Sequence, residues 1–158
     1  MDYDKYTGNP VLTRNDLPDG SSKFDFRAPK IWQRPDGSYR CVAGNCTMDG
    51  DGRILLFSSP DGIKWKYEKI LAADNKRFGR MWECPDFFEP DGKDVLITSP
   101  QDMLPSGFEY HNGNSTLCLI GSYDETSEIF TEEHNQAIDC GIDFYAPRQC
   151  LLRTTEGT

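Results

Sequence analysis

The sequence lacks any long hydrophobic run and is poor in cations. None of its segments approaches the ~20 consecutive apolar residues that cross a bilayer, and residues 1–20 contain no apolar stretch typical of an export signal. Only 17 Lys and Arg accompany 26 Asp and Glu, a net charge of -9. Because nucleic-acid binding requires clustered cations, we expect no nucleic-acid partner. We expect a soluble, cytoplasmic protein that contacts neither membrane nor nucleic acid.

Metal-binding and helical patterns are also missing. The six cysteines show no C-x-x-C spacing, so we expect them to be reduced, small apolar residues without a metal. His111 and His134 lie in polar surroundings that favour surface positions over ligands. No apolar stripe recurs with helical period. These absences predict no metal, no cofactor and little helix.

Short apolar runs separated by turn signals are what the sequence does contain. Runs such as Ile54–Phe57 and Leu117–Ile120 have the length of strands. Pro-Asp-Gly occurs at residues 35–37, 60–62 and 90–92, where Pro restricts φ and Gly accepts a positive φ. The pattern predicts an all-β chain of antiparallel hairpins.

One four-residue pattern, aromatic-variable-small-Pro, occurs three times at wide spacing. The copies are Phe26–Pro29, Trp82–Pro85 and Phe144–Pro147. Pro29 and Pro85 are 56 residues apart, and Pro85 and Pro147 are 62 apart. A repeat of this length with about four short strands fits the blade of a β-propeller. A β-sandwich with chance repeats is the alternative.

We therefore predict a partial β-propeller with about two complete four-stranded blades and flanking strands. Residues 1–24 would form the outer strand and loop of a preceding blade, 25–80 and 81–140 two blades, and 141–158 the first strand of a following blade. The predicted strands lie near residues 27–33, 39–46, 53–58, 65–71, 82–88, 94–99, 116–122 and 137–140.

The second position of each repeat carries the residues that could do chemistry. Arg27, Glu83 and Tyr145 share this position, so in a propeller all three would face one central channel. A guanidinium, a carboxyl group and a phenol together could bind a polyol and transfer a proton. Trp32, Trp82 and Phe144 would add an apolar wall. The alternative for Glu83 is a solvated carboxylate at a strand end.

The repeats also resemble the motifs of one enzyme family. Residues 26–30 resemble the arginine-aspartate-proline motif, and residues 81–88 the glutamate-cysteine motif, of glycoside hydrolase family 32, which includes invertases and sucrose-6-phosphate hydrolases. Residues 139–147 are similar to that family's next inner strand. The resemblance covers nearly the whole chain. It implies a five-bladed propeller that hydrolyses β-fructosides, namely sucrose, sucrose-6-phosphate or fructans, by a retaining double displacement.

The resemblance also implies roles for particular residues. Glu83 would be the acid/base and Arg27 a contact to the fructose ring, while Asp143 would bind the sugar or tune Glu83. A fructose-containing saccharide would be the ligand. Further substrate-binding positions implied in this way are Cys84, Tyr145 and Trp82.

The departures from the family are as informative as the matches. Ala28 stands where the family has the Asp that stabilises the transition state, and no tryptophan-methionine-asparagine-aspartate-proline segment supplies a nucleophile. Residues 15–18 (Asn-Asp-Leu-Pro) are a poor substitute, and Cys140 and Arg148 replace an expected Tyr and Gln. We therefore predict a catalytically incompetent chain that associates with itself through exposed blade surfaces. A non-catalytic carbohydrate-binding fragment, a propeller acting on arabinan or xylan, and a fragment without ligand remain as alternatives.

Overall fold

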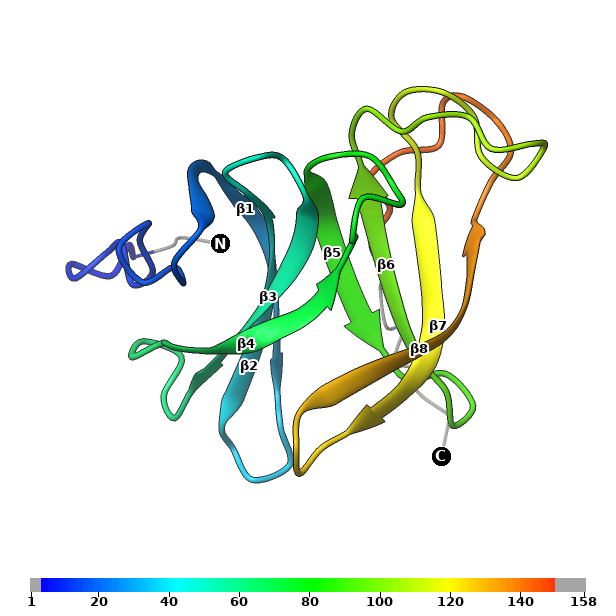
Figure 1. Cartoon of the computed structure of the whole chain (residues 1–158). Coiled ribbons are helices and arrows are strands. Elements are labelled where there is room, and N and C mark those ends of the chain that lie inside the picture. The colour runs from blue at the N-terminus through cyan, green and yellow to red at the C-terminus, as the bar shows by residue number, and fades with distance from the viewer. Residues whose placement is uncertain (1–3, 150–158) are drawn as a thin grey trace.

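The computed structural model describes residues 4–149, and this part of the chain contains eight strands and no helix that could span a membrane (Figure 1). Turn signals separate the strands, as the Pro-Asp-Gly triplets predict. The strands are β1 (Ser21–Gln33), β2 (Tyr39–Thr47), β3 (Gly52–Ser59), β4 (Lys66–Ala73), β5 (Trp82–Phe88), β6 (Asp94–Pro100), β7 (Leu117–Asp124) and β8 (Ile129–Ala137).

The strands form two four-stranded antiparallel sheets in simple chain order. The first sheet has the order β1-β2-β3-β4 and the second β5-β6-β7-β8. β1 and β5 are therefore the first strands of two successive units, and both contain the aromatic-variable-small-Pro repeat, within β1 at Phe26–Pro29 and at the start of β5 at Trp82–Pro85. The two sheets stand face to face as neighbouring blades (Figure 1). The all-β class and the partial propeller are confirmed.

The main core lies between the two sheets. Alternate residues of β2 and β3 point toward the second sheet, where the fully buried indole of Trp82 lies and its Nε1 donates to the Phe78 carbonyl oxygen at 3.0 Å. Gly44 allows β2 and β5 to approach closely, since a Cβ there would lie 2.2 Å from the Trp82 carbonyl oxygen. The buried members of this core are Val42, Ile54, Leu56, Leu71, Phe78, Trp82, Leu96, Met103, Tyr110, Leu117, Leu119 and Phe130.

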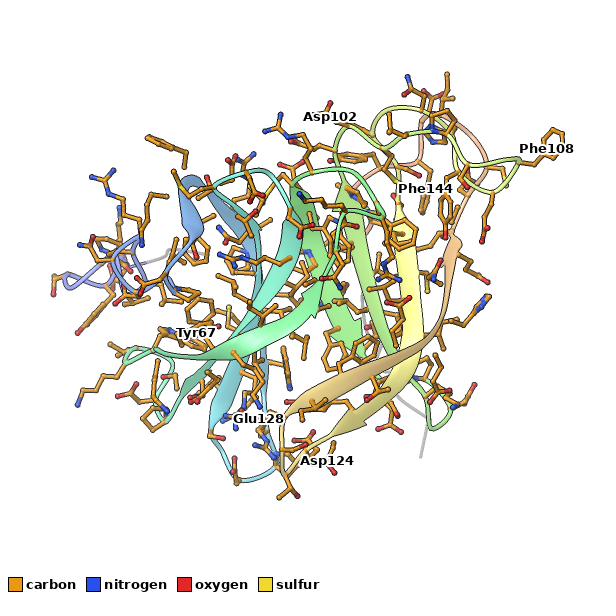
Figure 2. All side chains as sticks on the ribbon, viewed as in Figure 1. Tyr67, Asp102, Phe108, Asp124, Glu128 and Phe144 are labelled. Atoms are coloured by element: carbon orange, nitrogen blue, oxygen red, sulfur yellow. The ribbon has the colours of Figure 1, made fainter. Side chains whose placement is uncertain are left out.

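Ion pairs also join the two blades, and all of their cations come from the first unit. Three arginines of the first blade and its outgoing loop contact acids of β8 and of the turn before it. Figure 2 labels one of these acids, Glu128, at the turn between β7 and β8. Single exposed ion pairs contribute little, so it is the three pairs together that stabilise the relative orientation of the two sheets. The nitrogen-oxygen distances are 2.7 Å for Arg34–Glu125, 2.5 Å for Arg40–Glu128 and 2.7 Å for Arg77–Glu132.

The last predicted strand, residues 137–140, is wrong. β8 runs over Ile129–Ala137 instead, because the carboxylate of Asp124 accepts from the backbone N–H groups of Thr126 and Ser127 and turns the chain directly after β7. β8 contains several charged residues, so its sequence lacks an apolar run.

The ends of the chain also differ from the predicted strands. Residues 4–20 form turns and no strand of a preceding blade, and β1 begins at Ser21. Residues 141–149 form bends and contain no strand, while the predicted continuation over 150–158 lies outside the described residues. Within the described residues, neither segment pairs with an edge strand of the two sheets, so neither extends a sheet.

The loop between the blades contains a buried carboxyl group. Asp74 is fully buried; its Oδ1 accepts from the Phe78 backbone N–H, and its Oδ2 has no hydrogen-bond partner among the described residues. Burial, with a smaller contribution from Asp51, raises the pKa of Asp74 to about 6, although the hydrogen bond from the Phe78 backbone N–H and, less strongly, Arg77 act in the opposite direction. The native protein therefore binds this proton more tightly than the unfolded chain does.

We expect Asp74→Asn to stabilise the protein at pH 8 by about 2 kcal/mol and to change little at pH 4. Below the pKa that Asp74 has in the unfolded chain, its carboxyl group is neutral in both states and its burial costs no charge penalty. As the pH rises through about 6, the buried group loses its proton, and the stability that came from binding that proton in the native state is lost. Urea unfolding of both proteins at several pH values measures the difference, in which the titration of all other groups cancels. Parallel stability curves across this pH range would contradict the assignment.

Candidate active site

The third residue of each repeat has the same unusual backbone conformation. The small residue before the repeat Pro has a positive φ in all three copies: 55° at Ala28, 48° at Cys84 and 57° at Ala146. The β1–β2 register shifts between Arg27 and Lys30, and the β5–β6 register shifts at the equivalent place. Such bulges bend a strand and redirect the adjacent side chain. In the first two repeats, the residue before the bulged position (Arg27 and Glu83) is thereby directed to the same side of its sheet.

The structure brings Arg27, Glu83 and Tyr145 together. Arg27 Nη1 donates to Glu83 Oε1 at 2.9 Å, and the Tyr145 hydroxyl donates to Glu83 Oε2 at 2.7 Å. The Glu83 side chain is 14% exposed and that of Arg27 40% exposed, so the cluster is reachable from solvent. Three residues separated by 56 and 62 positions thus form one hydrogen-bonded unit.

The phenol of Tyr145 is held in its neutral form. Burial, followed by the hydrogen bond to Glu83 and the charge of that carboxylate, raises the pKa of Tyr145 well above its ordinary value. Its hydroxyl therefore keeps its proton at neutral pH and acts as a hydrogen-bond donor to Glu83. Charged and neutral donors on its two oxygens hold the Glu83 carboxyl in one orientation.

Asp25 completes this cluster, and the sequence reasoning missed it. Its carboxylate pairs with Nη2 of Arg27, and its other oxygen accepts from the Ser22 hydroxyl at 2.8 Å. The buried Asn45 side chain donates to the Asp25 carbonyl oxygen at 2.5 Å. Asp25 lies two residues before Arg27, and residues at this spacing share one face of a strand. This periodicity was the available signal.

A second polar layer lies just after the repeat prolines. Asp86 is fully buried; its Oδ1 lies 3.0 Å from Lys30 Nζ, and its Oδ2 accepts from the Gln149 backbone N–H at 2.6 Å. Arg148 donates to the carbonyl oxygens of Ala28 and Pro29 at 3.1 and 3.2 Å. Residues at or just after all three repeats therefore form two polar clusters, one around Glu83 and one around Asp86. The sequence predicted only the first.

Other predicted site residues lie elsewhere. Trp82 as a substrate contact is wrong, because its indole is fully buried between the blades. Trp32 is half-buried and packs on Phe87 with ring centroids 5.9 Å apart, so its place in an apolar wall of the site stays a prediction. Asp143 is exposed and makes no hydrogen bond to Glu83 among the described contacts, while Cys84 is half-buried beside Glu83 in the chain.

Phe144 is partly exposed, and its carbonyl oxygen accepts from the Thr116 hydroxyl at 3.0 Å (Figure 2). Its ring is therefore not held by burial against the cluster of Arg27, Glu83 and Tyr145. Among residues 4–149, no group of three or more His, Cys, Asp or Glu is arranged to hold a metal ion. The chemistry available at this place is that of a carboxyl group, a phenol and a guanidinium.

Two radial sheets whose inner strands β1 and β5 bring Arg27 and Glu83 together, with Tyr145 joining them from the segment after β8, define a segment of a β-propeller with a polar cluster at its inner edge. The match to known proteins makes this specific. Residues 1–155 match the domain described as Glycosyl hydrolases family 32 N-terminal domain. The chain belongs to glycoside hydrolase family 32.

Individual relatives agree with the family. The chain is 35% identical over 136 residues to the sucrose-6-phosphate hydrolase of Bacillus subtilis, covering 84% of this chain and 28% of that protein. It is 36% identical over 126 residues to the raffinose invertase of Escherichia coli, covering 80% and 26%. The chain therefore spans less than a third of the length of these relatives.

Solved structures show the same relation. The β-fructofuranosidase BmSUC1 of Bombyx mori superimposes with a TM-score of 0.82 at 40% identity, covering 90% of this chain and 30% of that protein. A mutant of the same enzyme in complex with sucrose gives a TM-score of 0.81. The sucrose-6-phosphate hydrolase of Lactobacillus gasseri gives 0.71 at 26% identity. The resemblance identified from the repeats is confirmed.

Proposed function

We propose that this chain is a segment of a glycoside hydrolase that acts on β-fructosides, with Glu83 as the acid/base of the reaction. The observation that carries the proposal is the pair of hydrogen bonds that hold Glu83 between Arg27 and Tyr145. Family membership supports it, and so do the sucrose-6-phosphate hydrolases, the invertase and the β-fructofuranosidases among the relatives. The substrate would be sucrose, its 6-phosphate or a fructan.

In the retaining reaction, protonated Glu83 gives its proton to the oxygen that links the fructosyl unit to its leaving group. The bond between that oxygen and the anomeric carbon breaks, and a second carboxylate, which in retaining enzymes lies ~5–5.5 Å from the acid/base carboxyl group, attacks this carbon to form a covalent intermediate. Glu83, now ionised, then takes a proton from the water that releases fructose. Arg27 and Tyr145 orient Glu83, and Arg27 also contacts fructose hydroxyl groups.

We propose that the chain as given does not complete this reaction. Ala28 offers a methyl group where a carboxylate would accept hydroxyl hydrogen bonds and stabilise the positive charge of the transition state. The φ of 55° at Ala28 is one that Asp adopts more readily than Ala, so the backbone here is suited to the missing carboxylate. No residue of the chain matches the family's nucleophile segment.

A non-catalytic carbohydrate-binding fragment is the second candidate. The partial exposure of Arg27 and Asp25, at 40% and 37%, favours it, because both side chains can still offer hydrogen bonds to sugar hydroxyls. The absence of a carboxylate at position 28 removes turnover but leaves these groups in place. Isothermal titration with fructose and sucrose separates the candidates: a binding fragment gives a saturable signal that Arg27→Ala removes, whereas a fragment without ligand gives none.

We expect rigorously purified chain to release no measurable fructose from sucrose, because nucleophile and stabilising carboxylate are both missing. A coupled assay of free fructose measures this, and Glu83→Gln is the matched control, since it keeps the size of the side chain and removes its proton transfer. Steady fructose release that Glu83→Gln abolishes would show a complete active site and refute the proposed incompetence.

A further inference from the structure

A large bulge in β1 lies directly before the residues of the candidate active site. The β1–β2 register shifts between Ser21 and Phe26, so residues 22–25 of β1 lie opposite Cys46 alone. Extra residues at a bulge lose the regular hydrogen bonds of the strand pair. The position of Asp25, the last residue of this bulge, is therefore set by contacts other than strand pairing.

Two buried polar side chains from the next strands hold the bulge. Asn45 of β2 is fully buried, and its Nδ2 donates to the carbonyl oxygens of Ser22 and Asp25 at 3.1 and 2.5 Å. Arg53 of β3 is 6% exposed. Its Nε donates to Asn45 Oδ1 at 3.0 Å, and its Nη2 donates to Ser21 Oγ at 2.7 Å. Both ends of the bulge are thus connected to the core of the first sheet.

The two carboxylate oxygens of Asp25 have different partners. Oδ2 accepts from the Ser22 hydroxyl at 2.8 Å and lies 3.6 Å from the Cys46 thiol. Burial, followed by the charge of Asp25, raises the pKa of Cys46, so this thiol stays protonated and can donate. Oδ1 accepts from Nη2 of Arg27. One oxygen is therefore held by the bulge, and the other holds the guanidinium.

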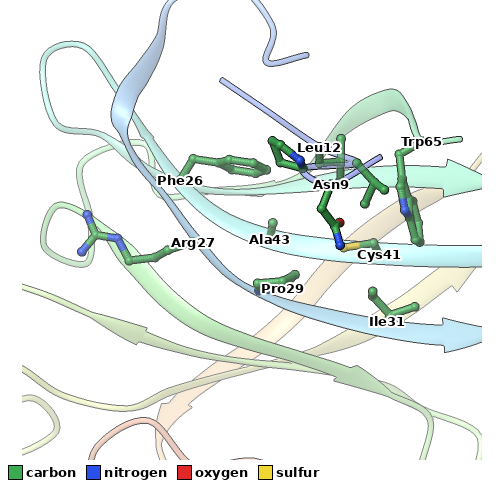
Figure 3. A pocket seen from close by; sticks show the side chains of 11 residues that line it. Asn9, Leu12, Phe26, Arg27, Pro29, Ile31, Cys41, Ala43 and Trp65 are labelled. Atoms are coloured by element: carbon green, nitrogen blue, oxygen red, sulfur yellow. The ribbon is translucent and has the colours of Figure 1, made fainter. Parts of the chain in front are cut away.

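The outward face of the first sheet, which is the face turned away from the second sheet, stays apolar beside these polar groups. Phe26 packs there on Phe57, with ring centroids 5.9 Å apart. Figure 3 shows Phe26 among the apolar residues that line a cavity of this face, with the Arg27 guanidinium pointing away from them. Neighbouring residues of β1 thus point to different surroundings, and the charged group of Arg27 is directed to polar partners.

Arg27 joins Asp25 to Glu83. The N–H groups of a guanidinium lie in a fixed plane, so holding one end of the group orients the other. Nη2 of Arg27 bonds to Asp25, while Nη1 donates to Glu83 Oε1 at 2.9 Å. The Arg27 side chain is 40% exposed, and a long side chain with this exposure loses rotamer freedom when it is held in one place. A charged anchor offsets that cost better than a neutral one does.

We propose that Asp25 is a positioning residue of the candidate active site, which anchors Nη2 of Arg27 and thereby presents Nη1 to Glu83. In the proposed function, on which this role rests, Glu83 is the acid/base and Arg27 orients it. Asp25 acts through Arg27, because no hydrogen bond joins it to Glu83 within the described part of the chain. The bulge and the buried Asn45 are the parts of the fold that place Asp25.

NMR of the arginine side chains in the chain without sugar tests the proposal. Rotation of the Arg27 guanidinium about its Nε–Cζ bond is slow while two different carboxylates hold its Nη groups, and exchange between the two Nη signals measures the rate. Arg27→Lys identifies these signals by their loss. We expect Asp25→Ala to speed the rotation by about tenfold, because a charge-assisted hydrogen bond is lost.

Asp36→Ala is the matched control. Asp36 also accepts from a nearby serine hydroxyl, that of Ser38 at 2.6 Å, but it contacts no member of the cluster, so the rotation of Arg27 should not change. If Asp25→Ala fails to fold, Asp25→Asn keeps the size of the side chain and should also speed the rotation. Rotation in the Asp25 variants as slow as in the original chain, with a loss of urea stability alone, would overturn the proposal.

Isothermal titration with fructose keeps this outcome separate from that of the proposed function. Faster rotation in Asp25→Ala without any fructose binding by the original chain would support the positioning role and count against a sugar site. Fructose binding by a chain whose Arg27 rotation ignores Asp25 would support the sugar site and overturn the positioning role. Where both hold, we expect Asp25→Ala to weaken fructose binding by about tenfold.

Discussion

Replacing Trp82 by Ala is expected to destabilise the chain by about 3–5 kcal/mol, which is a large part of the stability of a domain of this size. The indole is fully buried between the blades, and its N–H is bonded to the Phe78 carbonyl oxygen at 3.0 Å. The backbone of Gly44 packs directly against Trp82 and cannot move in to fill the cavity without breaking β2 pairing. Urea unfolding followed by circular dichroism measures the loss.

Trp65→Ala is the matched control for this change. Trp65 is half-buried on the outward face of the first sheet, so the same substitution should cost clearly less there. Because Trp82 contacts both sheets, the variant should lose both blades in one transition at lower urea concentration. A cost below that of Trp65→Ala would show that the interblade core does not hold the two sheets together.

Lys30→Met is expected to cost about 3 kcal/mol. It leaves the fully buried carboxylate of Asp86 without its cation, and breaking a buried pair from one side is more damaging than removing both partners. The remaining partner, the Gln149 backbone N–H at 2.6 Å, cannot balance a full charge. Chemical unfolding at pH 7 measures the loss, and Lys5→Met, at an exposed lysine, is the control.

The double variant Lys30→Met with Asp86→Leu separates charge from packing. Replacing both members by apolar residues removes the uncompensated charge, so the double variant should recover most of the stability that Lys30→Met loses. A double variant as unstable as the sum of the two single variants would show that the two side chains act independently. The ion pair would then not be the link between β1 and β5.

The repeat made the central part of the candidate site predictable. Arg27, Glu83 and Tyr145 occupy one position of a pattern that recurs three times, and equal repeat positions in radial sheets reach one axis. The structure brings all three into hydrogen-bonding contact. Their catalytic and binding roles stay a prediction, because contact alone does not establish a reaction.

Residues outside the repeat position were harder to assign. Trp82 has the composition of a sugar-stacking residue, and only the packing of the two sheets shows that it belongs to the core. Asp25 and Asp86 are ordinary acidic residues in the sequence, and their partners Arg27 and Lys30 become visible only once the strand registers are known. β8 was misplaced for a related reason, since its polar sequence has no apolar run.

By itself, the sequence determined the all-β class, the two blades, the family and the shared position of Arg27, Glu83 and Tyr145. These follow from local properties: alternation, turn residues and the spacing of a repeat act over a few residues or recur at fixed intervals. Tertiary structure alone decided that Trp82 is buried, that Asp86 is paired with Lys30, and that Leu12 and Leu17 pack on the outward face of the first sheet. Burial and charge pairing depend on which faces of the two sheets pack together, and this packing cannot be inferred from a local pattern in the sequence.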